Sequence, residues 1–399
     1  MIELVSKDKC SGCYACYNAC NIGAVTMDTD KSGFWFPQID TTKCIECSAC
    51  VNACPAIEKA EYQSPDPKAF IIQNKDDEIR RQSTSGGAFT GIALQTINKN
   101  GVVFGAAIDS DYTVSHIFVD NADGLARFRS SKYVQSKINN SYREAERILK
   151  TGREVCFSGT PCQIYGLKKY LGKDYDNLVT VDFMCRAVPS PKVLNKYLDY
   201  QKSKYPGFDR IVFRDKSRGY SYSGVALFDG DKIVYRGGSE IDPWLRLFLG
   251  GYCNRESCYE CKYQNGVRAS DITLWDCWGT GAYVPEWDDN KGTTNAIAWT
   301  QKGLEALKCD QYFRYKDIGI DNIDANIYRT KPLHKPDYDR IKFFNDCDTL
   351  PSTELISKYA PVTFKIRMKS FIRRSMYVLH IHDAVRNSVH KKRKAKKTR

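Results

Sequence analysis

The sequence predicts an α+β protein that is divided into several domains. A four-cysteine pattern occurs twice near the N-terminus and marks a small cysteine-rich unit. Residues 63–67 then form a proline-spaced linker. Beyond it, strand and helix patterns alternate as far as residue 202, which favours an α/β domain, and a hairpin pattern then favours an α+β part.

The two cysteine patterns share the spacing Cys-x2-Cys-x2-Cys-x3-Cys. In bacterial two-cluster ferredoxins this run places three cysteines on one 4Fe-4S cluster and the fourth on the other. We therefore predict a bacterial-ferredoxin-like domain over residues 1–62. One cluster is expected on Cys10, Cys13, Cys16 and Cys54, and its partner on Cys44, Cys47, Cys50 and Cys20. Zinc or disulfides fit less well, because zinc takes four ligands and disulfides need an oxidising compartment.

The elements of the α/β part follow in chain order. Strands are expected at residues 69–73, 101–108, 114–119, 154–157 and 178–183, and helices at 87–99, 161–170 and 191–202. A capping box of Ser141 and Glu144 is expected to begin a further helix that runs to Lys150. Residues 224–228 and 232–235, around the Asp229-Gly230 turn, then form the predicted antiparallel hairpin.

The net charge of +13 is concentrated in a basic tail at residues 361–399, where thirteen Lys or Arg stand against one acidic residue. The rest of the chain is nearly neutral, so the charge does not indicate nucleic-acid binding. The tail is either a solvated terminus or, because apolar residues lie among the basic ones, a helix in weak contact with an anionic membrane surface. We expect a cytoplasmic protein, since no signal segment and no window of about 18 apolar residues is present.

Two glycine-bearing turns of the α/β part are candidate ligand sites. The first opens a helix and would place hydroxyl and N–H groups around a phosphate, although such a turn is usually only a helix cap. It consists of Ser83, Thr84, Ser85, Gly86 and Gly87. The second turn consists of Ser158, Gly159 and Thr160, and it delivers Cys162 to the carboxyl end of a strand, where ligand sites of open α/β sheets concentrate.

A third cysteine group is possible around Cys162. Cys185 follows the next strand, and Cys258 and Cys261 form a Cys-x2-Cys pair. Two interpretations stay open: a third 4Fe-4S cluster on these four residues, with Cys253 as a competing ligand, or a structural zinc at the Cys-x2-Cys pair. The remaining cysteines are expected to be buried free thiols, namely Cys156, Cys277, Cys309 and Cys347.

Up to about residue 345, the sequence resembles the coenzyme F420 hydrogenase/dehydrogenase beta-subunit family, in the form that carries an N-terminal two-cluster ferredoxin domain. The resemblance rests on residues 83–87, 131–136, 157–163, 188–191, 213–216, 257–261, 270–273, 276, 278–279 and 289–293. Two positions depart from the family: Arg186-Ala187 stands where His-Gly is usual, and Cys277 stands where a phenylalanine is usual.

The resemblance implies an FAD-containing oxidoreductase whose flavin lies near the third 4Fe-4S cluster. Residues 68–155 would form the flavin-binding domain, and residues 156–345 the domain with the third cluster. Besides the two turns, the flavin would be lined by Lys132, Tyr133 and Gln135.

The implied reaction passes electrons between the clusters and a hydride-accepting small molecule, F420 or another. A ferredoxin or a hydrogenase/dehydrogenase subunit would be the redox partner. Two alternatives stay open: an electron-transfer subunit without a substrate of its own, and a reductase of cell-surface polysaccharide synthesis.

Overall fold

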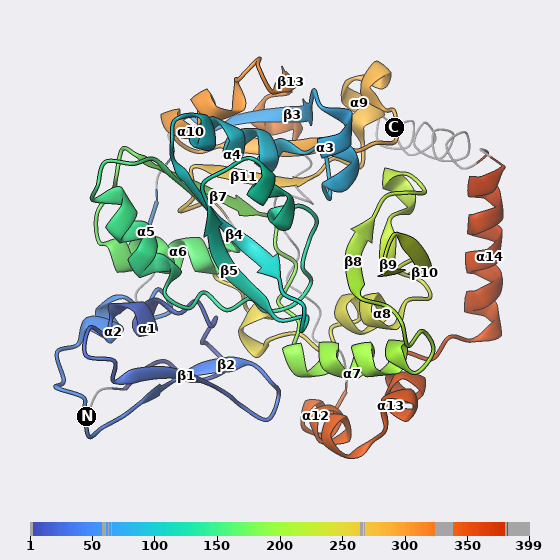
Figure 1. The fold of residues 1–399 in the computed structure, drawn as a ribbon, viewed down its shortest axis with the longest axis horizontal. Helices are drawn as coiled ribbons and strands as arrows, with labels where there is room; N and C mark the ends of the chain where they lie inside the picture. Colours follow the sequence, from blue (N-terminus) through green and yellow to red (C-terminus); the bar gives the residue numbers. More distant parts are fainter. Residues whose placement is uncertain are drawn as a thin grey trace.

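The computed structural model describes residues 3–57, 61–62, 64, 66–263, 266, 268–323, 338–379 and 381. Within them, a small N-terminal domain packs beneath a large mixed sheet, and a second sheet with its own helices lies beside it (Figure 1). The expected α+β architecture of several parts is therefore confirmed. None of the described helices is long and apolar enough to cross a membrane.

The N-terminal domain consists of two short helices and one hairpin. Helices α1 (Ala15–Ala19) and α2 (Ala49–Asn52) each follow a cysteine turn, and strands β1 (Val25–Thr29) and β2 (Trp35–Ile39) pair antiparallel. The residues before the two helices, Tyr14 and Ser48, both adopt left-handed backbone conformations. These left-handed residues bend the chain sharply at the start of each helix.

The large sheet has eight strands in the order β13-β3-β12-β11-β7-β6-β4-β5. Neighbours β4, β6, β7 and β11 are parallel, whereas β5, β12 and β13 pair antiparallel with their neighbours. The strands are β3 (Lys68–Asn74), β4 (Val102–Ile108), β5 (Val114–Val119), β6 (Val155–Gly159), β7 (Leu178–Phe183), β11 (Ile272–Asp276), β12 (Thr294–Ala298) and β13 (Phe313–Asp317). The domain boundary expected at residue 155 therefore falls inside one continuous sheet.

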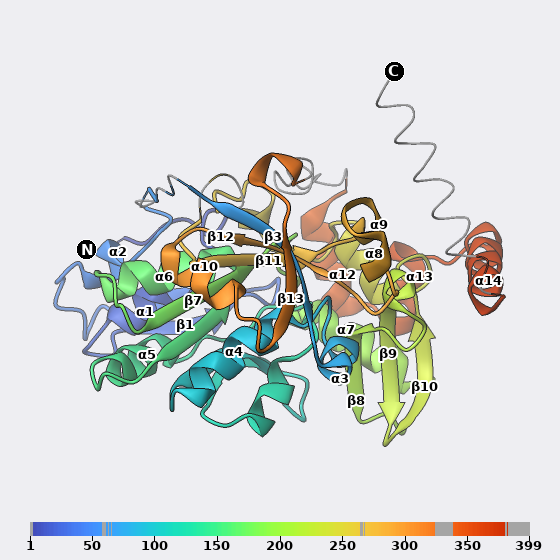
Figure 2. The same cartoon turned by 90° about the horizontal axis from the view of Figure 1, so that it is seen from above.

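Helices cover both faces of this sheet. On one face α4 (Ala88–Asn98) and α10 (Gln301–Leu307) pack with the side chain of Val103, while on the other α5 (Ser141–Leu149) and α6 (Pro161–Leu171) pack with Val102 and Phe104. Alternate residues of β4 thus face opposite layers, as the two-residue period of a strand requires. The N-terminal domain joins the second layer through α1, as Figures 1 and 2 show.

The prediction of a capping box at the start of α5 is wrong. Asn140 occupies the cap position without a side-chain hydrogen bond. The hydroxyl of Ser141 instead donates to the main-chain oxygen of His116 at 3.2 Å. A tertiary contact with β5 has therefore replaced the local cap.

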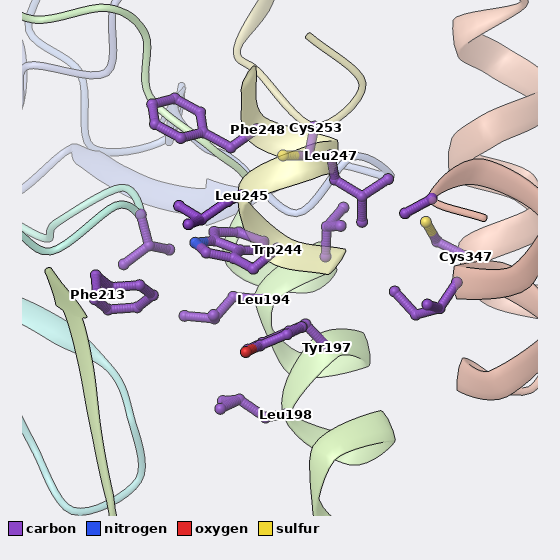
Figure 3. Packing of buried hydrophobic residues seen from close by; sticks show 14 of the residues in the cluster. Leu194, Tyr197, Leu198, Phe213, Trp244, Leu245, Leu247, Phe248, Cys253 and Cys347 are labelled. Atoms are coloured by element: carbon purple, nitrogen blue, oxygen red, sulfur yellow. The ribbon is translucent and has the colours of Figure 1, made fainter. Parts of the chain in front are cut away.

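The second sheet, with the order β10-β9-β8, contains the predicted hairpin. Its strands are β8 (Arg210–Asp215), β9 (Gly224–Asp229) and β10 (Lys232–Gly237). Around it lie α7 (Pro191–Lys202), α8 (Pro243–Leu249), α12 (Arg340–Thr349) and α13 (Ser352–Tyr359). Their shared core surrounds the fully buried Trp244, which packs beside Tyr197 and Phe213 (Figure 3).

Short elements complete the chain. These are α3 (Asp77–Gln82), α9 (Thr280–Tyr283) and the 3-10 turns η1 (Asp123–Phe128), η2 (Tyr220–Tyr222), η3 (Glu256–Cys258), η4 (Pro285–Trp287) and η5 (Ile320–Asn322). In the basic tail, residues 364–378 form the helix α14 (Phe364–Val378), which stands at the outer side of β10 (Figure 1). The tail's residues 380 and 382–399 lie outside the described part.

Candidate metal centres

The first cysteine group gathers in the N-terminal domain. Cys10, Cys13, Cys16 and Cys54 are all buried and together line one small cavity. The pKa of the Cys16 thiol is raised chiefly by burial and then by its neighbours Cys13, Cys10 and Cys54. The fourth cysteine of the second sequence pattern therefore lies with the first three of the first pattern, in the exchange expected from the spacing.

The second group contains the four N-terminal cysteines that do not belong to the first group. The pKa of Cys50 is raised first by burial and then by Cys20 and Cys44, so these three thiols are neighbours. Cys20 also accepts a hydrogen bond from the N–H of Ala24 at 3.2 Å. Cys47, from the same turn, is exposed, so this group faces the outside of the domain.

The third group forms at the carboxyl edge of the large sheet. Because β6 and β7 are parallel neighbours, Cys162 at the start of α6 and Cys185 just after β7 emerge on the same edge. Burial raises the pKa of Cys185, with further contributions from Cys258, Cys162 and Cys261. Cys253 interacts with Cys347 instead, so the competing ligand lies elsewhere.

Each group offers four thiols, which is the donor set of a 4Fe-4S cluster. Among the described residues, no group of three or more His, Cys, Asp or Glu side chains is placed to hold a metal ion as the side chains stand. The fit of the three groups to clusters therefore rests on the type of their donor atoms, which are thiols throughout. Of the expected buried free thiols, Cys156, Cys277 and Cys347 are buried, whereas Cys309 is only half-buried.

The first and third groups touch across the contact between α1 and α6. Cys162 helps to raise the pKa of the Cys13 thiol, behind the larger effect of burial, and the Ser11 side chain helps to lower the pKa of Cys162 against burial. The approach is close because α6 presents Gly166 there, where an added Cβ would lie 3.0 Å from Cys13 Sγ. The two groups are therefore neighbours, although 149 residues separate Cys13 from Cys162 in the sequence.

Two buried arginines flank the cysteine groups, and sequence reasoning missed both. Arg255 is fully buried, and its Nε donates to the main-chain oxygen of Cys10 at 2.7 Å while Nη1 donates to that of Trp35 at 3.2 Å. Arg268 donates to the main-chain oxygen of Tyr263 and helps to lower the pKa of Cys185 against the larger effect of burial. Their only sequence signal is a position within ten residues of the Cys-x2-Cys pair, which is not specific.

The serine/glycine turn lies between α3 and α4, at the carboxyl end of β3. Ser85 donates to the main-chain oxygen of Thr293 at 2.6 Å, and the N–H of Gly86 donates to the Thr294 hydroxyl at 2.8 Å. The Ser83 hydroxyl donates to the main-chain oxygen of Ile79. Gly87 occupies the N-cap position of α4 and has a left-handed backbone conformation. Most of the groups expected to face an anion are thus bonded within the protein.

The segment around residue 132 is tied to the same region. The hydroxyl groups of Thr84 and Ser131 lie 2.9 Å apart. Lys132 Nζ donates to the main-chain oxygens of Arg127 and Arg129, both at 2.8 Å, and burial lowers its pKa to about 7.

Tyr133 and Gln135 make their contacts away from the serine/glycine turn. The Tyr133 ring packs against Phe213 and Phe248. The Gln135 side-chain oxygen accepts from the N–H of Trp35 at 3.2 Å, which joins this segment to the N-terminal domain.

The second turn is held by a buried histidine that sequence reasoning also missed. His116 Nε2 donates to the main-chain oxygen of Ser158 at 3.0 Å, and its Nδ1 accepts from the Ser136 hydroxyl at 3.1 Å. Ser158 itself donates to the main-chain oxygen of Phe104, and Thr160 forms a capping box with Gln163. His116 therefore connects segment 131–136 to the end of β6, where Gly159 precedes Thr160.

A polar cluster completes the carboxyl edge at the end of β11. Arg214 pairs with Asp276 at 3.0 Å, and Tyr220 donates to the same carboxylate at 2.9 Å. The Tyr220 ring stacks on Trp278 with 4.5 Å between ring centres, and Trp278 is 45% exposed. Nearby, Cys277 is buried, so this departure from the family does not face solvent.

Comparison with known proteins identifies two regions of the chain. Residues 9–57 match the 4Fe-4S dicluster domain, and residues 152–318 match the C terminus of the coenzyme F420 hydrogenase/dehydrogenase beta subunit. The coenzyme F420-dependent sulfite reductase of Methanocaldococcus jannaschii is 27% identical over 314 residues, which are 76% of this chain and 46% of that protein. The chain thus spans about half the length of this curated relative.

A solved structure is also similar, that of the F420-reducing [NiFe] hydrogenase complex from Methanosarcina barkeri, a xenon derivative. The TM-score is 0.46 at 14% identity, over 76% of this chain and 97% of that one. The two family matches cover both the first cysteine patterns and the sheet edge that carries the third group. The chain therefore carries a region, residues 152–318, that matches the C terminus of the coenzyme F420 hydrogenase/dehydrogenase beta subunit, and a 4Fe-4S dicluster domain on its N-terminal side.

Proposed function

We propose that this chain is an iron-sulfur flavoprotein oxidoreductase that exchanges electrons between a redox partner and a hydride-accepting small molecule. The contact between the first and third cysteine groups carries the proposal. Bound 4Fe-4S clusters transfer single electrons, and a bound flavin exchanges one or two, which suits it to hydride chemistry. The chain's own contribution is to bind these groups in a fixed order and to exclude water from them.

The order of the three cysteine groups follows from their exposure. The second group contains the exposed Cys47 and would meet a partner at the surface. The first group is buried and has both others as neighbours, since Cys16 packs with Cys20 and Cys50 of the second group and Cys13 interacts with Cys162 of the third. The third group lies at the sheet edge, where the Cys162 thiol contacts the candidate flavin residue Thr160. Cys10, Cys13, Cys16 and Cys54 would therefore hold the middle member of the series.

Several groups at the sheet edge fit a polar cofactor such as FAD. The Nε of Arg129, the hydroxyl of Ser130 and the Nη2 of Arg214 are buried and form no hydrogen bond with another described residue. Such buried donors are costly unless a ligand or water satisfies them. The stacked pair of Tyr220 and Trp278 offers an aromatic face beside them. We assign the flavin to this edge, with residues 83–87, 131–136 and 158–160 as its walls.

Coenzyme F420 is the first substrate to test, because the M. jannaschii relative is named for its dependence on it. A second function, that of an electron-transfer subunit without a substrate of its own, is favoured by one observation: the chain matches only 46% of that relative. The two functions differ in whether the isolated chain turns over a small molecule.

Cofactor content of the full chain, purified without air, tests the proposal. We expect about twelve irons and about twelve acid-labile sulfides per chain, together with one flavin. About eight irons with bound zinc would remove the third cluster, and protein without flavin would end the flavoprotein assignment. Reduction of F420 with dithionite as donor would then separate the oxidoreductase from the electron-transfer subunit.

A further inference from the structure

A large cavity lies far from the cysteine groups, between the three-stranded sheet and the C-terminal helices. It has a volume of about 580 Å³, within the range of small-molecule sites. Its walls come from β9, β10, α7, α13 and α14, which stand together in Figure 1. Neither the cysteine groups nor the candidate flavin residues contribute to it.

The charge of the walls is one-sided. Five cationic side chains line the cavity, namely Lys204, Arg218, Arg236, Arg367 and Arg374, and no Asp or Glu is among the lining residues. Arg236 is paired with Asp215 at 2.8 Å. Within the described part of the chain, the other three arginines form no ion pair. The walls therefore carry a net positive charge, which favours the binding of an anion.

The surroundings of Arg218 also favour an anion in the cavity. Burial lowers the pKa of its guanidinium, and the nearby charges of Arg236 and Arg374 lower it further. Like charges that converge on one space repel one another, and an anion between them relieves the repulsion. Residues 382–399 do not have the negative charge that would complement this cavity, because they contain eight Lys or Arg and a single acidic residue.

We propose that this cavity binds the phosphate group of a phosphorylated ligand. Guanidinium groups recognise phosphate through paired, charge-assisted hydrogen bonds, and several from different elements can surround one. Four tyrosines also line the walls and supply flat surfaces and hydroxyl groups for the rest of the ligand: Tyr200, Tyr205, Tyr222 and Tyr235.

Helix α14 forms one wall, and specific contacts hold it in place. Arg373 pairs with Glu240 at 3.2 Å, and the ring of Tyr377 stacks on that of Tyr222 with 4.9 Å between ring centres. Arg367 and Arg374 are thereby presented to the cavity from the helix, and Arg218 from the loop between β8 and β9. The same loop carries Tyr220, which contacts Asp276 at the sheet edge, so an occupant would sit behind a loop of the candidate active site.

The phosphate has two possible sources, a soluble molecule or a lipid headgroup. The second is relevant because α14 exposes Phe364, Met368, Phe371 and Ile372 beside the cavity. Both sources share the same recognition chemistry. The test therefore needs one arm for each.

The experiment uses the full chain with its clusters loaded and compares two charge reversals with one matched control. Arg367→Glu and Arg374→Glu change lining residues of α14, while Lys369→Glu changes an exposed cation of the same helix that does not line the cavity. Pyrophosphate and glucose 1-phosphate are the soluble probes, followed by calorimetry. Vesicles of phosphatidylcholine with and without phosphatidylglycerol are the lipid probes, followed by co-sedimentation.

We expect saturable binding in at least one arm, weakened about tenfold or more by each arginine reversal and changed less than about twofold by Lys369→Glu. Binding of the soluble probes alone identifies a soluble ligand, and binding of phosphatidylglycerol vesicles alone identifies a headgroup. The proposal is overturned by no binding in either arm, or by equal losses in all three variants. Circular dichroism confirms that each variant is folded.

Discussion

Arg255 Nε donates a hydrogen bond to the main-chain oxygen of Cys10 at 2.7 Å, which places a buried positive charge directly behind the first cysteine group. Its Nη2 is buried without a hydrogen-bond partner among the described residues. The same guanidinium also helps to lower the pKa of Cys162 and Cys258, against the larger effect of burial. Arg255 therefore acts on the first and third groups together.

Replacement of this charge should change a reduction potential. A cation beside a cluster favours the reduced, more negative form, so Arg255→Met should lower the midpoint potentials of the two adjoining clusters. Arg255→Lys, which keeps the charge, should lower them less. Titration followed by electron paramagnetic resonance measures this, with exposed Arg127→Met as the control. Potentials that stay unchanged in Arg255→Met would contradict this role.

The third cysteine group should account for a third of the bound iron. Cys258→Ser and Cys162→Ser should each reduce the content from about twelve to about eight irons per chain, since one cluster is lost. The matched control is Cys309→Ser, a half-buried cysteine outside the three groups. An equal iron content in all of these variants would remove the third cluster from the model of the site.

The turn before α4 should tolerate no side chain at Gly86. An added Cβ would lie 2.6 Å from the main-chain oxygen of Ile72 and 2.8 Å from the nitrogen of Thr294. Gly86→Ala should therefore cost about 1–3 kcal/mol of unfolding free energy and loosen bound flavin. Gly279→Ala is the control, since nothing lies within 4 Å of a Cβ there. Urea unfolding and flavin release measure the two effects, and equal behaviour of both variants would contradict the prediction.

His116 should make stability depend on pH. Burial lowers its pKa from 6.5 to about 4, so between these values the unfolded chain binds a proton that the folded chain does not. The stability that it contributes is present above about pH 6.5 and is lost as the pH falls toward 4. From about pH 7.5 to 5 the loss should be about 2 kcal/mol.

The measurement is the difference in urea unfolding between the wild type and His116→Gln. The difference isolates His116 from Asp182 and Asp242, whose pKa values burial raises to about 6 and which act in the opposite direction. A wild type and a variant with parallel pH profiles would show that His116 titrates normally.

Local signals in the sequence predicted much of this molecule. Prolines at the first position of α6 and α7 mark where these helices begin, and short runs rich in apolar residues mark β5 and β7 with the observed bounds. The spacing of the cysteines predicted the exchange of Cys20 and Cys54. Each of these features depends on residues that lie close together in the sequence.

Other features depend on residues that are far apart and could not be predicted in this way. The pairing of Ile72 in β3 with Thr294 in β12 unites both halves of the large sheet, and the contact of Arg255 with Cys10 spans 245 residues. No local window contains both partners of either pair. For the same reason, the bond from Ser141 to His116 displaced the cap that its neighbours indicated.

Gly166 lets α6 lie against Cys13, because an added Cβ there would stand 3.0 Å from Cys13 Sγ. With clusters bound at the first and third cysteine groups, as we propose, electron transfer between them would slow exponentially with their separation. One methyl group at residue 166, which would push α6 away from Cys13, would then be enough to lower the rate of transfer.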